Sequence, residues 1–265
     1  MACAFSLNGS TTTKDRFDPA VRAVLSDSLA NTTRLVGVLG GMGPLATVDF
    51  LQKIIAVTLA QSDQDHVPVV VSNIPQIPDR ANAYLTGSTS PLAAMLECGR
   101  RLVAAGANLI VMPCNTAHLW FDELRSGLKV EMLHIVDTAL EDALNYSGPG
   151  VRIGLLATEA TLASCLYKKR LSTFGDCTVE WVLPAQIEIR QLIMPGIAAV
   201  KASDLVLGTR LLSSAARALT DRGATILILG CTEIPLVLNQ HLVRVPIIDP
   251  TVSLARRVVS WARAN

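Results

Sequence analysis

Two of the six cysteines stand in closely matched settings along this 265-residue chain. Cys114 follows an apolar run and precedes Asn115-Thr116, and Cys231 follows a similar run and precedes Thr232-Glu233. The polar residues after each cysteine are of the type that begins a helix. The free N–H groups and partial positive charge of a helix start favour a thiolate over a thiol, so these two sulfurs are well placed for acid–base chemistry.

Two thiols on opposite sides of one cleft would suit the inversion of a carbon acid. One thiolate removes a proton from one face of the carbon, and the other thiol returns a proton to the opposite face. The cysteine pKa, normally about 8.5, is lowered towards neutrality by a helix end, so one residue type can fill both roles. The alternative is that both are buried structural cysteines, since free Cys is among the most buried residue types. We expect the remaining cysteines to be inert: Cys3, Cys98, Cys165 and Cys177.

The two cysteines belong to an internal duplication. The stretch Gly106-Ala-Asn-Leu-Ile-Val-Met-Pro-Cys114 recurs as Gly223-Ala-Thr-Ile-Leu-Ile-Leu-Gly-Cys231, at an offset of 231 − 114 = 117 residues. Gly37 recurs as Gly154 at the same offset, 154 − 37 = 117. We therefore predict two similar α/β units, each with a cysteine at the carboxyl end of a strand, where open α/β sheets bind ligands. Related by a pseudo-twofold axis, such units would direct both thiols into one cleft.

Apolar runs alternate with helical patterns through the first unit. We expect strands at residues 35–39, 67–72, 109–112 and 133–136, and helices at residues 45–60 and 92–105. Strands with few polar residues, separated by helices, are typical of parallel sheets covered on both faces. The predicted fold class is therefore α/β, with two similar parallel-sheet domains and the active site between them.

The predicted domain boundaries follow from the duplication. We expect an N-terminal extension at residues 1–33, a first α/β domain at residues 34–138 plus 246–265, and a second at residues 139–245. Gly148, Pro149 and Gly150 supply linker residues between the two copies.

The composition excludes several classes of protein. With 23 Lys+Arg against 22 Asp+Glu, the chain has neither the basic excess of a nucleic-acid-binding protein nor the acidic excess of a disordered tail. The longest uncharged stretch, residues 102–121, contains too many polar residues, Gly and Pro for a bilayer helix. The first residues lack the basic segment and apolar run of a secretory signal. We expect a cytoplasmic protein that acts on a small molecule and binds neither nucleic acid nor membrane.

The motifs around both cysteines resemble those of the aspartate/glutamate racemase family. The two cysteine signatures of that family are similar to Ile110-Val-Met-Pro-Cys-Asn-Thr-Ala-His-Leu119 and Leu227-Ile-Leu-Gly-Cys-Thr-Glu-Ile-Pro-Leu236. Two further stretches resemble the aspartate racemase branch of that family: Gly37-Val-Leu-Gly-Gly-Met-Gly-Pro-Leu-Ala-Thr47 and Pro75-Gln-Ile-Pro-Asp-Arg80. Glutamate racemases usually carry histidine where Glu233 stands and lack a histidine equivalent to His118. The resemblance covers the chain from about residue 34 to the C-terminus.

This resemblance implies a cofactor-independent racemase, without pyridoxal phosphate or metal, that interconverts L- and D-aspartate or another acidic amino acid. It implies that Cys114 and Cys231 are the acid–base thiols and that the chain forms a homodimer. It also implies a set of substrate-binding residues: Met42, Gly43, Arg80, Asn115, Thr116, Thr158, Thr161, Lys201, Thr232 and Glu233.

Five of these residues have more specific implied roles. Asn115, Thr116 and Thr232 would hold the α-carboxylate or the ammonium group of the substrate. Arg80 and Lys201 would bind its distal carboxylate, for which a planar guanidinium is well suited. The alternative is that each of these two cations is a solvated surface charge.

Two stretches depart from the family pattern. The loop that usually reads Ala-Thr-x-Gly-Thr is Ala157-Thr158-Glu159-Ala160-Thr161 here, and alanine disfavours the positive φ that glycine allows. Met194-Pro195-Gly196 interrupts the helix that should carry Lys201, and we expect Pro195 to kink or restart it. Both departures bear on substrate choice.

Other functions fit some of the same residues. Residues 41–46 fit a dinucleotide fingerprint, but Asp63 and Asp65 precede the expected second strand instead of ending it. The four histidines lack zinc-ligand spacing. A maleate isomerase, a hydantoin racemase and a catalytically silent ligand-binding protein on this scaffold are the alternatives to an acidic amino-acid racemase.

Three further residues have two interpretations each. His118 lies one helical turn after Cys114, where it either tunes that thiol or is a hydrogen-bonded structural histidine. Asp137 and Asp249 follow expected strands, and they either orient pocket groups or cap the next helix.

Overall fold

A computed structural model describes residues 34–146, 151–175 and 179–264 of the chain. The predicted N-terminal extension at residues 1–33 lies outside these ranges. So do the predicted linker residues Gly148, Pro149 and Gly150, and the cysteines Cys3 and Cys177.

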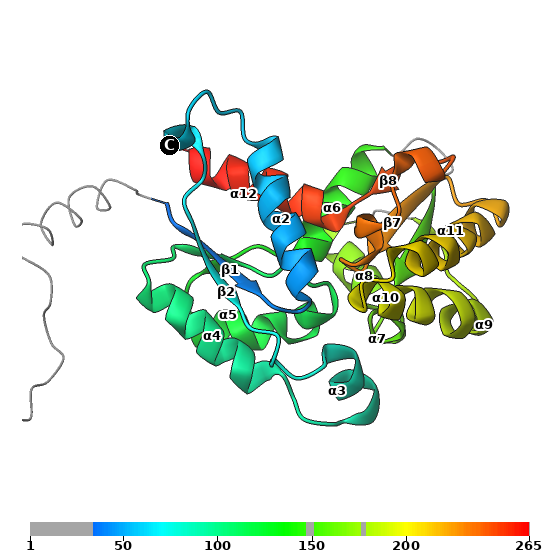
Figure 1. The fold of residues 1–265 in the computed structure, drawn as a ribbon, viewed down its shortest axis with the longest axis horizontal. Helices are drawn as coiled ribbons and strands as arrows, with labels where there is room; N and C mark the ends of the chain where they lie inside the picture. The colour runs from blue at the N-terminus through cyan, green and yellow to red at the C-terminus, as the bar shows by residue number, and fades with distance from the viewer. Residues whose placement is uncertain (1–33, 147–150, 176–178, 265) are drawn as a thin grey trace, which may run out of the picture. The chain divides into compact units, whose positions relative to one another are not determined.

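Two four-stranded parallel sheets form the framework of the fold (Figure 1). The first sheet has the order β2-β1-β3-β4, with strands Val69–Asn73, Val36–Gly40, Leu109–Val111 and Glu131–Met132. The second has the order β6-β5-β7-β8, with strands Glu180–Val182, Arg152–Ala157, Ile226–Gly230 and Ile247–Ile248. The predicted α/β class with two similar parallel sheets is confirmed, because both halves have the same strand order.

The duplication extends to register and close packing. Gly37 lies opposite Ile110 in the first sheet, and Gly154 lies opposite Leu227 in the second, so both partners are also related by 227 − 110 = 117 residues. A Cβ atom on Gly37 would lie 2.9 Å from the Cβ of Ala107, and one on Gly154 would lie 3.0 Å from the Cβ of Ala224. Only glycine fits at either position without a shift of its neighbours, which is why the two glycines recur with the cysteines.

Helices make the crossovers that parallel strands require. Those of the first half are α2 (Pro44–Val57), α3 (Arg80–Thr86), α4 (Leu92–Ala104), α5 (Phe121–Leu128) and α6 (Ile135–Asn145). Those of the second half are α7 (Glu159–Ala163), α8 (Leu166–Leu171), α9 (Gln186–Glu188), α10 (Met194–Lys201), α11 (Leu205–Asp221) and α12 (Pro250–Arg263). α2 and α4 are the helices expected at residues 45–60 and 92–105.

Shorter turns stand between several of these elements. The 3-10 turns are η1 (Asp63–Asp65), η2 (Thr116–Trp120), η3 (Ser172–Phe174), η5 (Ile234–Leu236) and η6 (Gln240–Leu242). A π-helical turn, η4 (Ile189–Ile193), precedes α10. Pro195 stands in the first turn of α10, and helical residues run from α9 through η4 into α10 without a break. The expected kink or restart therefore takes the form of the π-helical turn η4, because proline lacks the N–H that a regular helix interior needs.

The strand predicted at residues 133–136 is wrong. β4 ends at Met132, and α6 begins at Ile135 with His134 as its N-cap. The His134 Nδ1 accepts a hydrogen bond from the Val136 N–H at 3.2 Å. Apolar residues of α6 continue at helical spacing and are fully buried: Ile135, Val136, Ala139, Leu140 and Ala143. A four-residue apolar run is compatible with either structure, and the longer periodicity decides for the helix.

The two aspartates expected at strand ends have different roles. Asp249 is the N-cap of α12, and its Oδ1 accepts from the Thr251 N–H at 2.9 Å. Asp137 lies within the first turn of α6 and does not cap it. Its Oδ1 instead accepts from the Arg170 Nε at 2.7 Å, which joins α6 to α8.

α6 and α12 join the two halves. α12 packs against α2 and α6 (Figure 1). Lys53 of α2 also forms an ion pair with Asp249 at 2.6 Å. One hydrophobic cluster contains strand residues of both sheets, including Val36 and Ile226. Arg34–Asn265 consequently form one compact unit.

The predicted domain boundaries within this unit stay a prediction. The assignment of the C-terminal segment to the first domain disagrees with the strand pairing. Residues 246–265 are predicted in the first domain, but β8 pairs with β7 in the second sheet. α12, which follows β8, is the part of this segment that packs on the first half.

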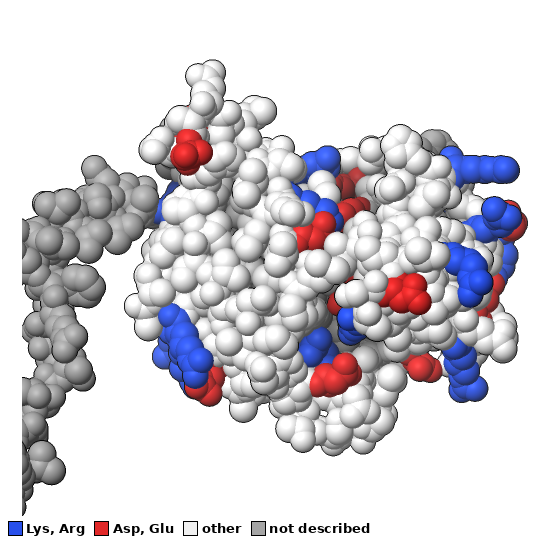
Figure 2. Space-filling view, viewed as in Figure 1, with Lys and Arg blue, Asp and Glu red and all other residues white. Residues whose placement is uncertain are grey.

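Charged side chains are interspersed on the surface. The face in Figure 2 is mostly uncharged, with Lys and Arg scattered among Asp and Glu. Within the described ranges, none of the helices has both the length and the apolar composition needed to cross a membrane.

A close backbone approach after β1 predicts a strong substitution effect. Gly41 has a φ of +89°, and a Cβ there would lie 2.4 Å from the backbone C and O atoms of Ile74. We expect Gly41→Ala to lower the free energy of unfolding by about 3 kcal/mol or more, because left-handed strain and a backbone collision add. Gly87→Ala is the matched control: its φ is +67°, and a Cβ there meets nothing within 4 Å. It should cost about 1 kcal/mol. Equal losses in urea denaturation would contradict the packing argument.

Candidate active site

The two duplicated cysteines line one pocket. Cys114 lies just beyond β3 and Cys231 directly follows β7, so both stand at the carboxyl ends of equivalent strands. Their side chains are buried, with 6% and 5% exposure. This cysteine pocket, of about 20 Å³, is completed by Met42, Asp79, Arg80, Ala81, Asn115, Thr116, Thr158, Lys201, Thr232 and Glu233. The prediction that the two thiols reach one cleft agrees with this geometry.

Two predicted site residues lie just outside the cysteine pocket. Gly43 lines an adjoining outer cavity of about 520 Å³, which shares Asp79, Arg80, Lys201 and Glu233 with the cysteine pocket. Thr161 lies behind Thr158 and is buried. The outer cavity therefore opens from the same cations and carboxylates that close the cysteine pocket.

Two lining residues and one supporting residue of the pocket were not predicted from the sequence. Asp79 stands beside Arg80 in a motif already singled out, and as the N-cap of α3 it accepts from the Asn82 N–H at 2.6 Å. That cap pattern could have been found. Ala81, on the first turn of the same helix, could not. Tyr167 lies 52 residues from its partner Asn115, and nothing in the sequence relates the two.

Three buried polar atoms of the pocket have no hydrogen-bond partner among the described residues. They are the Arg80 Nε, the Asn115 Nδ2 and the Glu233 Oε1. Two are donors and one is an acceptor. Buried polar groups are normally paired, so unpaired ones around a cavity indicate a ligand with complementary groups. A molecule with carboxylate oxygens and an ammonium group would satisfy all three.

A threonine cluster spans the two halves. The Thr116 hydroxyl lies 3.0 Å from those of Thr158 and Thr161, and the Thr158 hydroxyl donates to that of Thr161 at 3.0 Å. Thr158 is also the N-cap of α7 and accepts from the Thr161 N–H. Alanine at position 160 is compatible with this cap. The departure from the family loop therefore leaves both threonines at the site.

Cys231 is held as a thiol. Its Sγ donates to the Glu233 Oε2 at 3.0 Å. Burial and the negative charge of Glu233 raise the pKa of Cys231 well above its usual value, although Lys201 opposes this. The expectation that a helix end lowers the pKa is wrong for Cys231, because only the 3-10 turn η5 follows it and a buried carboxylate stands beside it.

Two cations approach the pocket from different elements. Arg80 begins α3 and is 8% exposed, with its Nη1 donating to the carbonyls of Ile77 and Pro78 at 3.2 and 3.1 Å. Lys201 ends α10. Partial burial lowers the pKa of Lys201, but the negative charge of nearby acidic groups, above all Glu233, outweighs it and leaves the pKa raised. Both cations are thus pocket groups, and Arg80 is not a solvated surface charge.

His118 has a structural role. Its Nδ1 donates to the Cys114 carbonyl at 2.8 Å, and its Nε2 accepts from the Ile135 N–H at 3.1 Å. Because both ring nitrogens are used, His118 joins the segment after Cys114 to the start of α6. It does not line the cysteine pocket within the described part of the chain.

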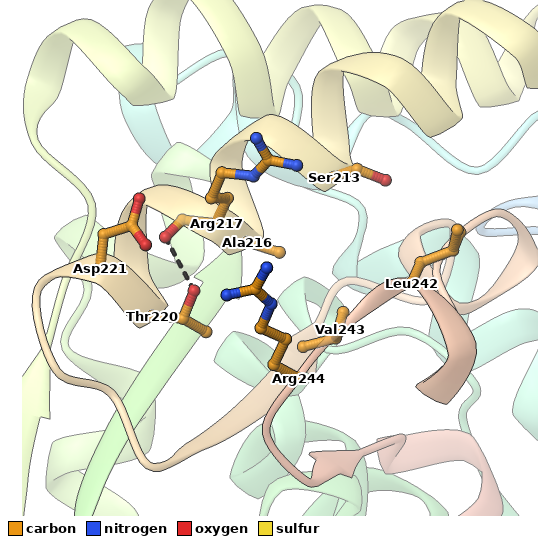
Figure 3. A pocket seen from close by; sticks show the side chains of 8 residues that line it. All are labelled: Ser213, Ala216, Arg217, Thr220, Asp221, Leu242, Val243 and Arg244. Atoms are coloured by element: carbon orange, nitrogen blue, oxygen red, sulfur yellow. Dashed lines mark hydrogen bonds between the residues drawn. The ribbon is translucent and has the colours of Figure 1, made fainter.

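A separate hollow of about 300 Å³ lies between the end of α11 and residues 242–244. Figure 3 shows Arg217, Thr220 and Arg244 around it. Neither duplicated cysteine lines it, so the predicted chemistry does not belong there. Among the described residues, no group of three or more His, Cys, Asp or Glu could hold a metal ion.

The chain is similar to amino-acid racemases. Residues 39–258 match the family model of Asp/Glu/hydantoin racemases. The broad specificity amino-acid racemase RacX of Bacillus subtilis (strain 168) is 30% identical over 233 residues, which cover 85% of this chain and 97% of that protein. A glutamate racemase of Persephonella marina is 29% identical over 143 residues, 54% of this chain and 52% of that one.

Solved structures give the same relationship. An aspartate racemase of Picrophilus torridus has a TM-score of 0.77 and 34% identity, covering 86% of this chain and 94% of that chain. The glutamate racemase of Francisella tularensis, solved with D-glutamate, has a TM-score of 0.61 at 15% identity and shares the fold alone, over 87% of this chain and 81% of that one.

The buried His118 predicts a pH dependence of stability. Burial lowers its pKa from 6.5 to about 4. The contribution of neutral His118 to the free energy of unfolding is fully present above pH 6.5. It is lost as the pH falls through 4, because the unfolded chain binds a proton that the folded chain excludes. Between about pH 6 and pH 4.5, we expect the free energy of unfolding of the wild type to fall about 1.4 kcal/mol per pH unit more steeply than that of His118→Asn.

Urea denaturation at several pH values measures both slopes. His241→Asn, a change at an exposed histidine of η6, is the control and should keep the wild-type slope. Parallel slopes for His118→Asn and the wild type would contradict the assignment of this pH dependence to the lowered pKa of His118.

Proposed function

The chain belongs to the Asp/Glu/hydantoin racemase family, and from this premise we propose that it interconverts L- and D-aspartate without pyridoxal phosphate or a metal. The observation that carries the proposal is one pocket with two duplicated cysteines and three unpaired polar atoms. The thiols are the acid–base pair, and the unpaired atoms fit an amino acid. The cytoplasmic location and the homodimer stay predictions.

Proton transfer needs one cysteine in each protonation state. Cys231, as a thiol, suits the proton donor, because its pKa is raised. Cys114, as a thiolate, then takes the α-proton from one face of the substrate and becomes a thiol. Cys231 delivers its proton to the opposite face of the carbanion and becomes a thiolate. Lys201 lies close enough to offset part of the repulsion between that thiolate and Glu233.

Substrate recognition uses the unpaired atoms. The Asn115 Nδ2, with the hydroxyls of Thr116 and Thr232, would bind the α-carboxylate. The Glu233 Oε1 would accept from the ammonium group. The Arg80 Nε and Lys201 would bind the distal carboxylate, since charge-assisted hydrogen bonds are the stronger ones. An amino dicarboxylate would pair all three unpaired atoms at once.

A wider range of amino acids is the second candidate. The outer cavity begins at Arg80 and Lys201, where the substrate side chain would end, and its volume is about 520 Å³. A side chain longer than that of aspartate could extend into it. The Bacillus subtilis relative is named a broad specificity racemase, in line with this reading.

Racemisation can be followed directly in heavy water. Purified protein with L-aspartate and no added cofactor should lose the α-proton signal in proton NMR while D-aspartate accumulates in chiral analysis of the same sample. Parallel reactions with glutamate, alanine and lysine distinguish an enzyme specific for aspartate from a racemase of broad specificity. Exchange without inversion would reject the two-base mechanism. Inactivity on every amino acid, with turnover of maleate or a hydantoin, would reject the substrate class.

The cysteine roles predict a sharp contrast among alanine variants. Cys114→Ala and Cys231→Ala should each lose racemisation by at least about a thousandfold, because each removes one of two obligatory proton carriers. Cys98→Ala is the matched control, since Cys98 is also buried but lies on α4 outside the pocket. It should keep full activity. Near-normal turnover by Cys114→Ala or Cys231→Ala, with its unfolding midpoint unchanged, would contradict the two-base mechanism.

A further inference from the structure

Tyr167 touches the site without lining it. It lies on α8 in the second half, is 1% exposed, and packs its ring edge-on against Trp181 with 6.4 Å between ring centroids. Its hydroxyl donates to the Asn115 Oδ1 at 2.7 Å. Asn115 belongs to the first half and directly follows Cys114. This hydrogen bond therefore crosses from one half of the molecule to a substrate-binding residue of the other.

The hydrogen bond decides which end of the Asn115 amide faces the pocket. With the Oδ1 engaged by Tyr167, the Nδ2 is buried and unpaired among the described residues. Rotating the amide by half a turn would leave the buried phenol proton without that acceptor and would turn the Oδ1 towards the ligand. Both changes cost free energy, because an unpaired buried donor loses its hydration and two acceptors repel each other.

The phenol remains a donor at all working pH values. Burial raises the pKa of Tyr167 well above its usual value, and the negative charge of Asp249 adds to this effect. A tyrosine that keeps its proton can only be satisfied in this contact by facing an acceptor. The Tyr167 hydroxyl therefore favours the Asn115 orientation in which the Oδ1 faces it.

We propose that Tyr167 is a positioning residue that fixes the Asn115 amide so that its Nδ2 is presented to the substrate α-carboxylate. The inference rests on the proposed function and names a determinant of that same site. Tyr167 itself touches neither the substrate nor a thiol proton. Its effect passes through Asn115, and a role limited to joining the two halves is the competing explanation.

A double-mutant cycle separates the two explanations. Tyr167→Phe keeps the ring and its packing against Trp181 and removes only the hydroxyl. We expect kcat/KM for aspartate to fall about tenfold, largely through KM. The reason is that the Asn115 Nδ2 is no longer held in place to donate a hydrogen bond to the charged α-carboxylate. If Tyr167 acts through Asn115, the double variant Tyr167→Phe/Asn115→Ala is no slower than Asn115→Ala alone. Tyr146→Phe removes the hydroxyl of an exposed tyrosine and should leave kcat/KM unchanged.

Two outcomes would overturn the inference. An unchanged KM in Tyr167→Phe would show that the amide does not need the phenol. Multiplying losses in the double variant, with a lower unfolding midpoint, would assign Tyr167 to joining the halves.

Calorimetric titration of aspartate into the wild type and the three variants of the cycle separates this test from the test of the racemase proposal. A wild type that binds aspartate without racemising it would contradict the proposed function alone. The Kd values for aspartate would then replace kcat/KM in the double-mutant cycle. A wild type that neither racemises nor binds aspartate would reject both.

Discussion

The hydroxyls of Thr116, Thr158 and Thr161 meet where the two halves of the protein touch, and the cysteine pocket depends on that contact. Cys114 belongs to one half and Cys231 to the other, so their approach is set by how the halves lie together. The threonine hydroxyls are buried, and breaking their contact would leave several of them unpaired. The hydrogen bond from Tyr167 to Asn115 crosses between the halves in the same place.

The duplication makes the framework symmetric, while the residues after each cysteine make the chemistry asymmetric. Equivalent strands, registers and close-packed glycines place the sulfurs at matched positions. Asn115 follows one cysteine and offers donors, whereas Glu233 stands two residues after the other and accepts a hydrogen bond from its thiol. Burial makes that carboxylate effective, because charges interact more strongly away from water. The two sulfurs therefore have different polar neighbours within similar backbones.

The cysteine pocket is narrow in this structure. A volume of about 20 Å³ holds about one water molecule, far less than an amino acid. On the proposed function, the cysteine pocket must widen to admit the substrate, and the outer cavity adjoins it at Arg80 and Glu233. Among the described residues, no member of the hydrophobic cluster shared by the two halves lines the outer cavity, so this core can stay packed while the pocket widens.

The sequence by itself determined the α/β class, the duplication and the two cysteines, because these depend on local apolar patterns and on a repeat whose offset can be counted. Gly37 and Gly154 could be paired without a structure, and most of the pocket residues were adjacent to recognisable motifs. The start of α6 was missed, because Leu133–Val136 is apolar enough for either a strand or a helix.

Only the tertiary structure decided the charge state of Cys231, the structural role of His118 and the contact between Tyr167 and Asn115. The pKa of a thiol or an imidazole depends on burial and on neighbours from several elements, which a linear pattern does not contain. The partners Tyr167 and Asn115 stand on different halves of the chain. Long-range contacts of this kind arise from the packing of whole elements, and that packing fixes the direction of each side chain.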